Sequence, residues 1–180
     1  MITVIFESHS TTFDNEQHLA SGQNDIELFP LGIGQAEELG QRYKDEKFAA
    51  IFCSDLQRSY KTATIAFRNK SPIIQDVRLR ECDYGDLTQQ PEEIVKLLKV
   101  DHVSAPFPHG EGYEQTAVRM KSLLTDLLKD YANQKVMIIG HRATQYGLEH
   151  WINGKSLQEC VTGKWNWQLG WIYYFNKLDF

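Results

Sequence analysis

Short apolar runs and amphipathic segments alternate along the chain. The runs are rich in β-branched and aromatic residues and are bounded by polar or turn-forming residues, a pattern typical of strands. They predict five strands, at residues 2–7, 48–54, 72–77, 135–141 and 171–175. The second and fourth runs are almost continuously apolar or small, which predicts that both faces of these strands are buried.

Four segments between the predicted strands have the periodicity of helices. They cover residues 33–46, 57–68, 91–99 and 112–131. In the last segment, apolar residues recur at the spacing of one helix face, namely Met120, Leu123, Leu124, Leu127, Leu128 and Tyr131. The alternation of strands and helices predicts an α/β sandwich, in which ligands bind beyond the carboxyl ends of the parallel strands.

The composition is that of a folded domain in a reducing compartment. The chain has 180 residues, 42% hydrophobic and 24% charged, so we expect residues 1–180 to form a single domain. The net charge of −5 argues against broad nucleic-acid binding, although a local group of cations can still hold a small anion. No apolar run approaches the roughly 20 residues that span a bilayer, and the N-terminus lacks the features of a signal peptide. Cys53, Cys82 and Cys160 lack metal-binding spacing and are interpreted as reduced thiols, so we expect a cytoplasmic protein. From the charge and the lack of a long apolar run, we expect neither a nucleic acid nor a membrane as its partner.

Chemically active side chains follow several of the predicted strands. His9 follows the first strand, Arg58 the second and His141 the fourth, while Glu81 comes shortly after the third. If these strands are parallel, the four side chains meet at one edge of the sheet. Taken singly, each has a plainer explanation, as a solvated arginine, a surface carboxylate or a structural histidine.

The four side chains together match the needs of covalent phosphate-ester cleavage. A neutral imidazole attacks phosphorus, cations hold the phosphoryl oxygens, and a carboxylic acid protonates the leaving oxygen before water hydrolyses the phosphohistidine. His9 suits the role of nucleophile, Arg58 and His141 hold the phosphoryl group, and Glu81 is the acid. This chemistry requires no metal and no other cofactor.

Five motifs, in this order, resemble those of the histidine phosphatase superfamily, the phosphoglycerate-mutase-like enzymes. Asn15 follows His9 by six residues, as does the family's phosphate-contacting asparagine. The other motifs are LFPLGIGQAEELG at 28–40, FCSDLQRSYKTATIA at 52–66, RLRECDYGDL at 78–87 and VMIIGHRAT at 136–144. The resemblance implies a three-layer α/β/α sandwich with a mostly parallel central sheet and a phosphohistidine mechanism. It implies the same roles for His9, Arg58, Glu81 and His141 as the chemistry above.

The sequence departs from the family pattern around the proposed nucleophile. The family's Arg-His-Gly signature is replaced by Ser8-His9-Ser10, which removes the arginine that grips the phosphoryl group. A charge-assisted bond of this kind contributes about 1.5–3 kcal/mol, so its loss weakens activity without necessarily abolishing it. Ser8 and Ser10 can still donate hydrogen bonds to phosphate oxygens. Arg142 stands where the family usually has glycine, and we predict that its guanidinium reaches the space left at position 8 and binds the phosphate there. The alternative is that it points away to an acidic partner.

Two other features have alternative interpretations. The segment KWNWQLGWIYYF at 164–175, with Trp165 and Trp167, is most simply a strand with core-facing aromatics, and the alternative is a platform that stacks substrate. In the loop at 107–115, Glu111 either accepts hydrogen bonds from groups of the site or favours the dipole of the helix that follows. His109, in the same loop, is an optional pocket residue.

We therefore expect a metal-independent phosphatase that hydrolyses a small phosphorylated metabolite through a phosphohistidine on His9. A phosphoglycerate-type mutase is the nearest alternative, but mutases of this family are generally longer, with an insertion and a tail that keep water out. A phosphoester-binding protein impaired by Ser8 is the alternative from another class. It does not explain why the proton donor Glu81 is present together with His9, Arg58 and His141.

Overall fold

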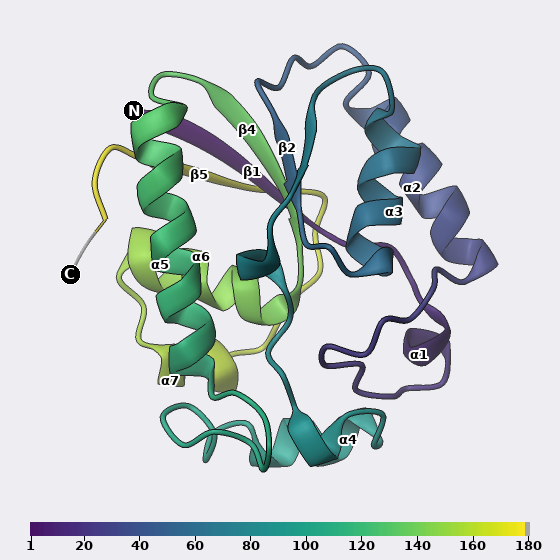
Figure 1. Cartoon of the computed structure of the whole chain (residues 1–180), viewed down its shortest axis with the longest axis vertical. Coiled ribbons are helices and arrows are strands. Elements are labelled where there is room, and N and C mark those ends of the chain that lie inside the picture. The colour runs from purple at the N-terminus through teal and green to yellow at the C-terminus, as the bar shows by residue number, and fades with distance from the viewer. Residues whose placement is uncertain (179–180) are drawn as a thin grey trace.

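The centre of the fold is one five-stranded sheet (Figure 1). The structure is a computed structural model that describes residues 1–178. The strands are β1 (Ile2–Ser8), β2 (Ile51–Cys53), β3 (Ile73–Gln75), β4 (Lys135–Gly140) and β5 (Trp171–Phe175). They lie in the order β3-β2-β4-β1-β5, in which β5 runs antiparallel to β1 and the other neighbouring pairs are parallel. All five predicted strands are present, with shorter bounds at β2 and β3, and the mostly parallel sheet is confirmed.

The helices are more numerous than the sequence pattern predicts. Their bounds are α1 (Phe13–Glu16), α2 (Pro30–Arg42), α3 (Gln57–Phe67), α4 (Glu92–Leu98), α5 (Tyr113–Asp130), α6 (Arg142–Asn153), α7 (Leu157–Thr162) and the 3₁₀ helices η1 (Val77–Leu79) and η2 (Gly85–Leu87). The four predicted helices correspond to α2, α3, α4 and α5, whereas α1, α6 and α7 were not predicted. Helix α2 begins at Pro30 rather than residue 33, because proline suits the first helical position, where no N–H is needed.

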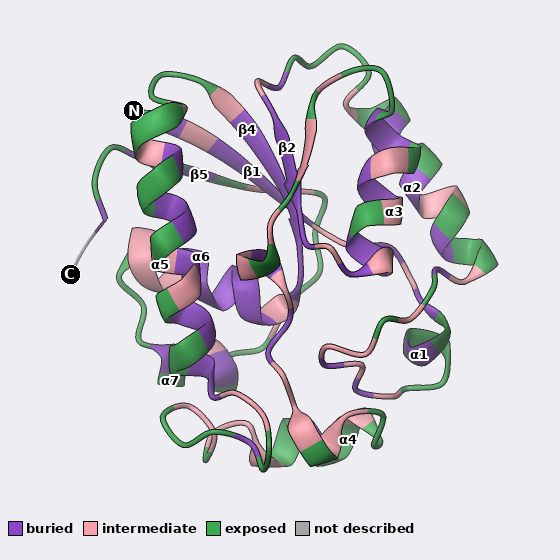
Figure 2. Cartoon of the chain, viewed as in Figure 1, coloured by how far each residue is buried: buried purple, intermediate pink, exposed green. Residues whose placement is uncertain are grey.

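Helices cover both faces of the sheet. On β4, Val136 and Ile138 point to the face covered by α5 and α6 and pack in one cluster with Met120. Met137 and Ile139 point to the opposite face and pack against residues of α2 and α3. Figure 2 shows that the strands and the inward sides of these helices are buried. The three-layer α/β/α sandwich is thus confirmed, and β4 is buried on both faces as its apolar run predicts.

A separate buried cluster closes one side of the region beyond the carboxyl ends of the strands. It joins Val95 of α4, Phe107 of the loop before α5, Tyr146 of α6 and Leu157 of α7. These elements form a wall beside the sheet edge at which the predicted site residues lie.

The three cysteine side chains are free thiols, and those of Cys53 and Cys82 are buried. Burial raises the pKa of the Cys53 thiol to about 12, so this group stays protonated near neutral pH. Within residues 1–178, no helix combines the length and the apolar character needed to cross a membrane.

Candidate active site

His9 and His141 lie side by side because β1 and β4 are parallel and share a register. Ser8 pairs with Gly140, and the N–H of His9 donates to the carbonyl of Gly140 over 3.1 Å, so each histidine directly follows a paired strand end. The centroids of the two rings are 5.0 Å apart. Glycine is required at position 140, because a Cβ there would lie 2.6 Å from Oγ1 of Thr144.

The hydrogen bonding of His9 determines which ring nitrogen is available for reaction. Its Nδ1 lies 2.8 Å from the carbonyl oxygen of Ser10, and since a carbonyl only accepts, Nδ1 carries the proton. Nε2 therefore keeps its lone pair. Burial, together with the positive charge of Arg58, lowers the pKa of His9 from 6.5 to about 3. His9 is thus neutral near pH 7, which is the state that a nucleophilic imidazole requires.

His141 caps the N-terminus of α6 and contacts the segment after β2. Its N–H donates to Oγ1 of Thr144 over 2.8 Å. Its ring Nε2 lies 2.8 Å from Oγ of Ser54, a contact between two buried side chains that the sequence analysis missed. Burial and the charge of Arg58 lower the pKa of His141 well below its ordinary value, so this imidazole is also neutral.

Arg58 is a buried side chain at the start of α3, with only 1% of its surface exposed. Its Nη1 donates to the carbonyl of Asn24 over 2.8 Å, and its Nη2 donates to the carbonyl of Gly22 over 2.7 Å. These carbonyl groups, from the loop that precedes α2, fix the plane of the guanidinium. A fixed guanidinium can hold phosphate oxygens without further loss of side-chain freedom.

Two buried nitrogen atoms of the site lack a partner within the protein. Among residues 1–178, the buried side-chain nitrogen and oxygen atoms without a hydrogen bond are Nε of Arg58, Nδ1 of His141 and Oδ2 of Asp14. A buried polar group that is left unpaired costs about 1–3 kcal/mol, so such atoms mark places where a ligand can bond. Arg58 and His141 line, together with His9, a cavity of about 630 Å³.

Glu81 is held by three backbone N–H groups. Its Oε1 accepts from Cys82 and Ala143 over 2.8 and 3.1 Å, and its Oε2 accepts from Arg142 over 3.1 Å. Arg142 and Ala143 are the first residues of α6, whose N-terminus attracts negative charge. The carboxyl group lines the same cavity as the two histidines and Arg58. The structure therefore brings all four predicted catalytic side chains together.

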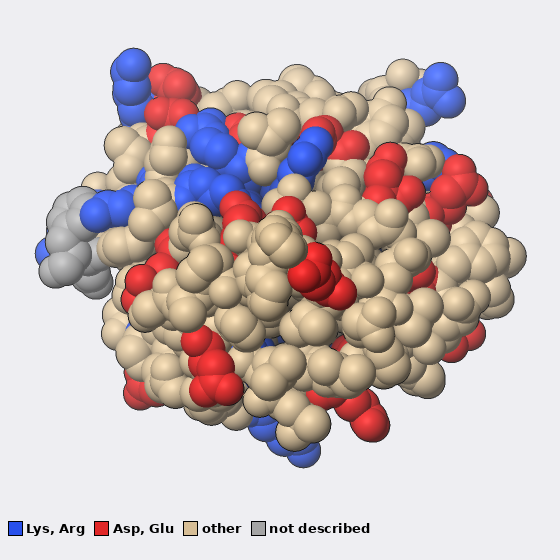
Figure 3. Space-filling model, turned by 60° about the horizontal axis from the view of Figure 1, so that its bottom comes forward, with Lys and Arg blue, Asp and Glu red and all other residues tan. Residues whose placement is uncertain are grey.

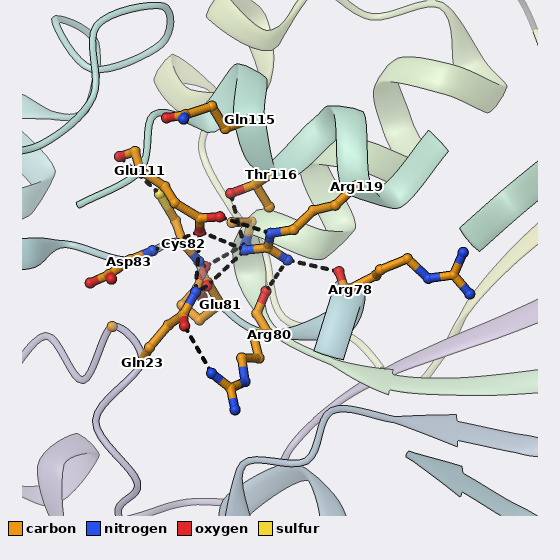
Figure 4. A network of polar contacts seen from close by, with 12 residues as sticks. Gln23, Arg78, Arg80, Glu81, Cys82, Asp83, Glu111, Gln115, Thr116 and Arg119 are labelled. Carbon is orange, nitrogen blue, oxygen red and sulfur yellow. Dashed lines mark hydrogen bonds and ion pairs between the residues drawn. The ribbon is translucent and has the colours of Figure 1, made fainter. Parts of the chain in front are cut away.

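Arg119 and Glu111 fix the segment that carries Glu81 (Figure 4). Nη1 of Arg119 donates to the carbonyls of Arg78 and Arg80, each over 2.7 Å, and Nη2 donates to the carbonyl of Glu81 over 2.9 Å. Nε and Nη2 of Arg119 also bond the two carboxylate oxygens of Glu111, over 3.1 and 2.8 Å. Glu111 thus fixes the guanidinium of Arg119, which in turn holds the segment that carries Glu81. Glu111 lies before the N-cap of α5 rather than in its first turn. The sequence analysis missed Arg119, which lies on α5, far along the chain from Glu81.

Ser8, Ser10 and Asn15 also line the cavity. Oδ1 of Asn15 accepts from the N–H and the hydroxyl of Thr12, both over 3.0 Å, so its amide NH₂ is the group that can donate to a ligand. The N–H of Ser10 donates to Oγ1 of Thr62 over 3.1 Å, which leaves the Ser10 hydroxyl for this purpose. Within residues 1–178, no group of three or more His, Cys, Asp or Glu side chains is arranged to hold a metal ion.

The Arg142 side chain lies in the cavity against an aromatic ring. Its guanidinium carbon is 4.4 Å from the centroid of Trp165, a cation–π contact. Nε1 of Trp165 donates to Oε1 of Gln145 over 2.7 Å, which fixes the orientation of the indole. Arg142 and Trp165 both line the cavity.

Two expectations about accessory residues were wrong. Trp165 and Trp167 do not belong to a core-facing strand, because β5 begins only at Trp171 and the residues before it form a loop. Gly170, with a φ of 72°, lies in the left-handed region and separates this loop from the strand. His109 is not among the described residues that line the cavity, and its exposed ring instead pairs with an aspartate of η2.

The sequence is similar to those of phosphatases and mutases. The sequence model of the histidine phosphatase superfamily (branch 1) matches residues 4–166. The chain is 32% identical over 155 residues to the uncharacterized phosphatase PhoE of Bacillus subtilis, which covers 86% of this chain and 79% of that protein. It is 31% identical over 150 residues to the probable phosphoglycerate mutase GpmB of Erwinia tasmaniensis, which covers 78% of this chain and 70% of that protein.

Solved structures share the fold. YhfR of Bacillus stearothermophilus has a TM-score of 0.83 at 22% identity, covering 98% of this chain and 96% of that chain. A phosphoserine phosphatase variant from Entamoeba histolytica, in complex with phosphoserine, has a TM-score of 0.81 at 22% identity. That match covers 99% of this chain and 94% of the other.

Proposed function

Because the chain belongs to the histidine phosphatase superfamily, we propose that it is a metal-independent phosphatase of small phosphomonoesters. His9 is the nucleophile and forms a phosphohistidine. The PhoE relative, which carries the name of a phosphatase, and the near-complete overlap with a phosphoserine phosphatase fold support hydrolysis.

The observation that carries this proposal is the pair of unpartnered nitrogen atoms beside His9. Nε of Arg58 and Nδ1 of His141 are buried and have no partner within the described residues, and both residues line the cavity of His9, a neutral imidazole with a free lone pair. If the hydroxyl of Ser54 donates to Nε2 of His141, then Nδ1 of that ring carries a proton. Two N–H donors on residues that line the cavity of the nucleophile suit the oxygens of a transferring phosphoryl group.

The reaction then takes two steps. Nε2 of His9 bonds to phosphorus while the ester P–O bond breaks, and the carboxyl group of Glu81 gives its proton to the leaving oxygen. In the second step, water attacks phosphorus, the N–P bond breaks, and the Glu81 carboxylate takes the proton from the water. Arg58 and His141 hold the phosphoryl oxygens throughout. The hydroxyls of Ser8 and Ser10 and the amide of Asn15 supply further donors.

The distribution of charge on the face drawn in Figure 3 favours a small substrate over a polyanion. Figure 3 brings the lower side of Figure 1 forward and shows Lys and Arg side chains in a compact group, with Asp and Glu side chains beside it. Binding of a long nucleic acid uses a continuous basic surface, since many phosphates must be contacted.

Hydrolysis of an aryl phosphate, with and without a chelator, tests the proposal. We expect turnover by the wild-type protein that the chelator leaves unchanged and that is lost in His9→Ala. Loss of activity on chelation, or activity that survives in His9→Ala, would contradict it.

A mutase is a second candidate, because the GpmB relatives carry the name of phosphoglycerate mutases. Such an enzyme returns the phosphoryl group from histidine to its product instead of to water. Phosphoryl transfer that outpaces hydrolysis in the presence of a bisphosphorylated primer would favour the mutase.

A further inference from the structure

The cavity is lined by cations that phosphoryl binding does not account for, alongside the carboxylates of Glu7, Glu38, Glu81 and Glu92. Its cationic lining residues, among those that the structure describes, are Arg42, Arg58, Lys96, Lys99 and Arg142. Arg42 lies 3.6 Å from the carboxylate of Glu7, and Lys96 lies 2.6 Å from that of Glu92. Arg58 is bonded to two backbone carbonyls next to His9.

Among the described residues, the two remaining cations, Lys99 and Arg142, form no ion pair with a carboxylate, although the charge of Glu92 also acts on Lys99. Within residues 1–178, neither side chain has a carboxylate oxygen within 4.0 Å. Both are half-buried. Burial and the charge of Arg142 lower the pKa of Lys99, so the two cations, which line the same cavity, repel each other. An anion placed between them would relieve this repulsion, and partial burial strengthens its attraction to both.

We infer that Lys99 and Arg142 form a subsite for a second anionic group of the substrate, with Trp165 as its wall. This inference rests on the proposed function and defines the substrate class further. The substrate is a phosphomonoester that carries a second anion, either a carboxylate or a second phosphate.

The contacts of Arg142 favour this role over replacement of the arginine missing at position 8. The cationic charge that acts on both imidazoles is that of Arg58. The charge of Arg142 acts instead on Lys99 and on Tyr146, and its guanidinium is stacked on Trp165. The guanidinium thus lies against Trp165, and its charge acts on Lys99 at the end of α4.

Kinetic measurements with matched substrates distinguish binding of a second anion by Arg142 from binding of the phosphoryl group by Arg142. Alkyl phosphates are compared with ω-phosphooxyalkanoates and alkanediol bisphosphates of the same chain lengths, for the wild-type protein, Arg142→Gln, Lys99→Gln and Lys129→Gln. Lys129 is an exposed cation near the end of α5 and serves as the charge-matched control. We expect Arg142→Gln and Lys99→Gln each to lower kcat/KM for the doubly anionic substrates roughly 10- to 150-fold, and to leave the alkyl phosphates within about threefold.

Other outcomes would overturn the inference. An equal loss for alkyl phosphates would place Arg142 on the phosphoryl group, and unchanged kinetics with all substrates would exclude a second subsite. Preference for the carboxylate or for the bisphosphate series identifies the second anion. Arg142→Lys keeps the charge without the planar stacking and should retain part of the preference.

Binding measurements keep the subsite testable if the protein hydrolyses none of these esters. Calorimetry with non-hydrolysable ω-phosphonoalkanoates and alkylphosphonates compares the same variants without chemistry. A second subsite predicts tighter binding of the phosphonoalkanoate, lost in Arg142→Gln but not in Lys129→Gln. Equal affinity for both ligands in the wild-type protein would contradict the subsite, whereas absence of turnover alone would contradict only the proposed function.

Discussion

Replacing Arg119 by methionine should both destabilise the protein and impair catalysis, although Arg119 does not line the cavity. Its guanidinium holds three backbone carbonyls of residues 78–81 and both carboxylate oxygens of Glu111. Methionine keeps much of the apolar stem and removes all five of the donors. The segment before Cys82 would then lose its contacts to α5, and Glu81 its fixed position.

The structure gives the magnitude of this effect. Removal of one partner from a buried ion pair costs about 3–5 kcal/mol, because the other charge is left uncompensated. The Arg119 and Glu111 side chains are 17% and 25% exposed, so solvent compensates part of this cost, and we expect a loss of about 2–4 kcal/mol. For a chain of this length that corresponds to a fall in Tm of roughly 4–16 °C. Since general acid catalysis contributes about 10²–10⁴-fold, displacement of Glu81 should lower kcat by about 10- to 100-fold.

Urea unfolding and steady-state kinetics measure the two effects, with Arg78→Met as the matched control. Arg78 is on the same segment and pairs with Asp76 and Asp126, but it is more exposed and its side chain does not reach the Glu81 carbonyl. Its ion pairs should contribute only about 0–2 kcal/mol, and kcat should change little. If Arg119→Met matched the wild-type protein in both stability and kcat, the supporting role of the Arg119–Glu111 pair would be refuted.

Two further predictions concern pH. The pKa of His9 is about 3 in the folded protein and near 6.5 in the unfolded chain, so stability that His9 contributes above pH 6.5 is lost as the pH falls toward 3. The unfolding free energy of His9→Gln should therefore depend less on pH in this window than that of the wild-type protein. In the wild-type protein, ¹⁵N NMR should show a neutral, Nδ1-protonated His9 at pH 5. Titration of His9 near pH 6.5 would contradict the effect of burial. Burial raises the pKa of Glu7 above 4.5, so its contribution to stability is complete below pH 4.5 and is lost as the pH rises through the folded-state pKa. Urea unfolding at several pH values measures the difference in unfolding free energy between the wild-type protein and Glu7→Gln. This difference should decrease as the pH rises through the folded-state pKa of Glu7, and a difference that stays constant would refute a raised pKa.

The parts of the fold that the sequence predicts are those set by local pattern. Apolar runs identify the five strands, and the rule for carboxyl ends of parallel strands brings His9, Arg58 and His141 to one edge. Helix α6 escaped prediction because its first turn is largely polar, although Gly154, in the left-handed region at its end, was an available signal. The order of the strands also lay outside the pattern, since pairing is chosen by packing.

The parts of the site that escaped prediction depend on contacts between distant segments. Arg119 contacts the Glu81 segment only because α5 packs against η1. Arg142 meets Trp165 across a loop whose path no local periodicity specifies. Trp165 and Trp167 resemble a core strand in composition, but the strand begins only after Gly170 and both tryptophans line the cavity. Side-chain pairs of this kind follow from tertiary packing.

The most direct test of the role of His9 is to locate the phosphoryl group during turnover. The protein is mixed with an aryl phosphate, quenched in alkali, where phosphohistidine is stable, digested and mapped by mass spectrometry. Because Nδ1 of His9 is engaged by the Ser10 carbonyl, we expect the phosphoryl group on Nε2 of His9. Hydrolysis that proceeds with no phosphoryl group on His9, or with the group on His141 instead, would contradict it.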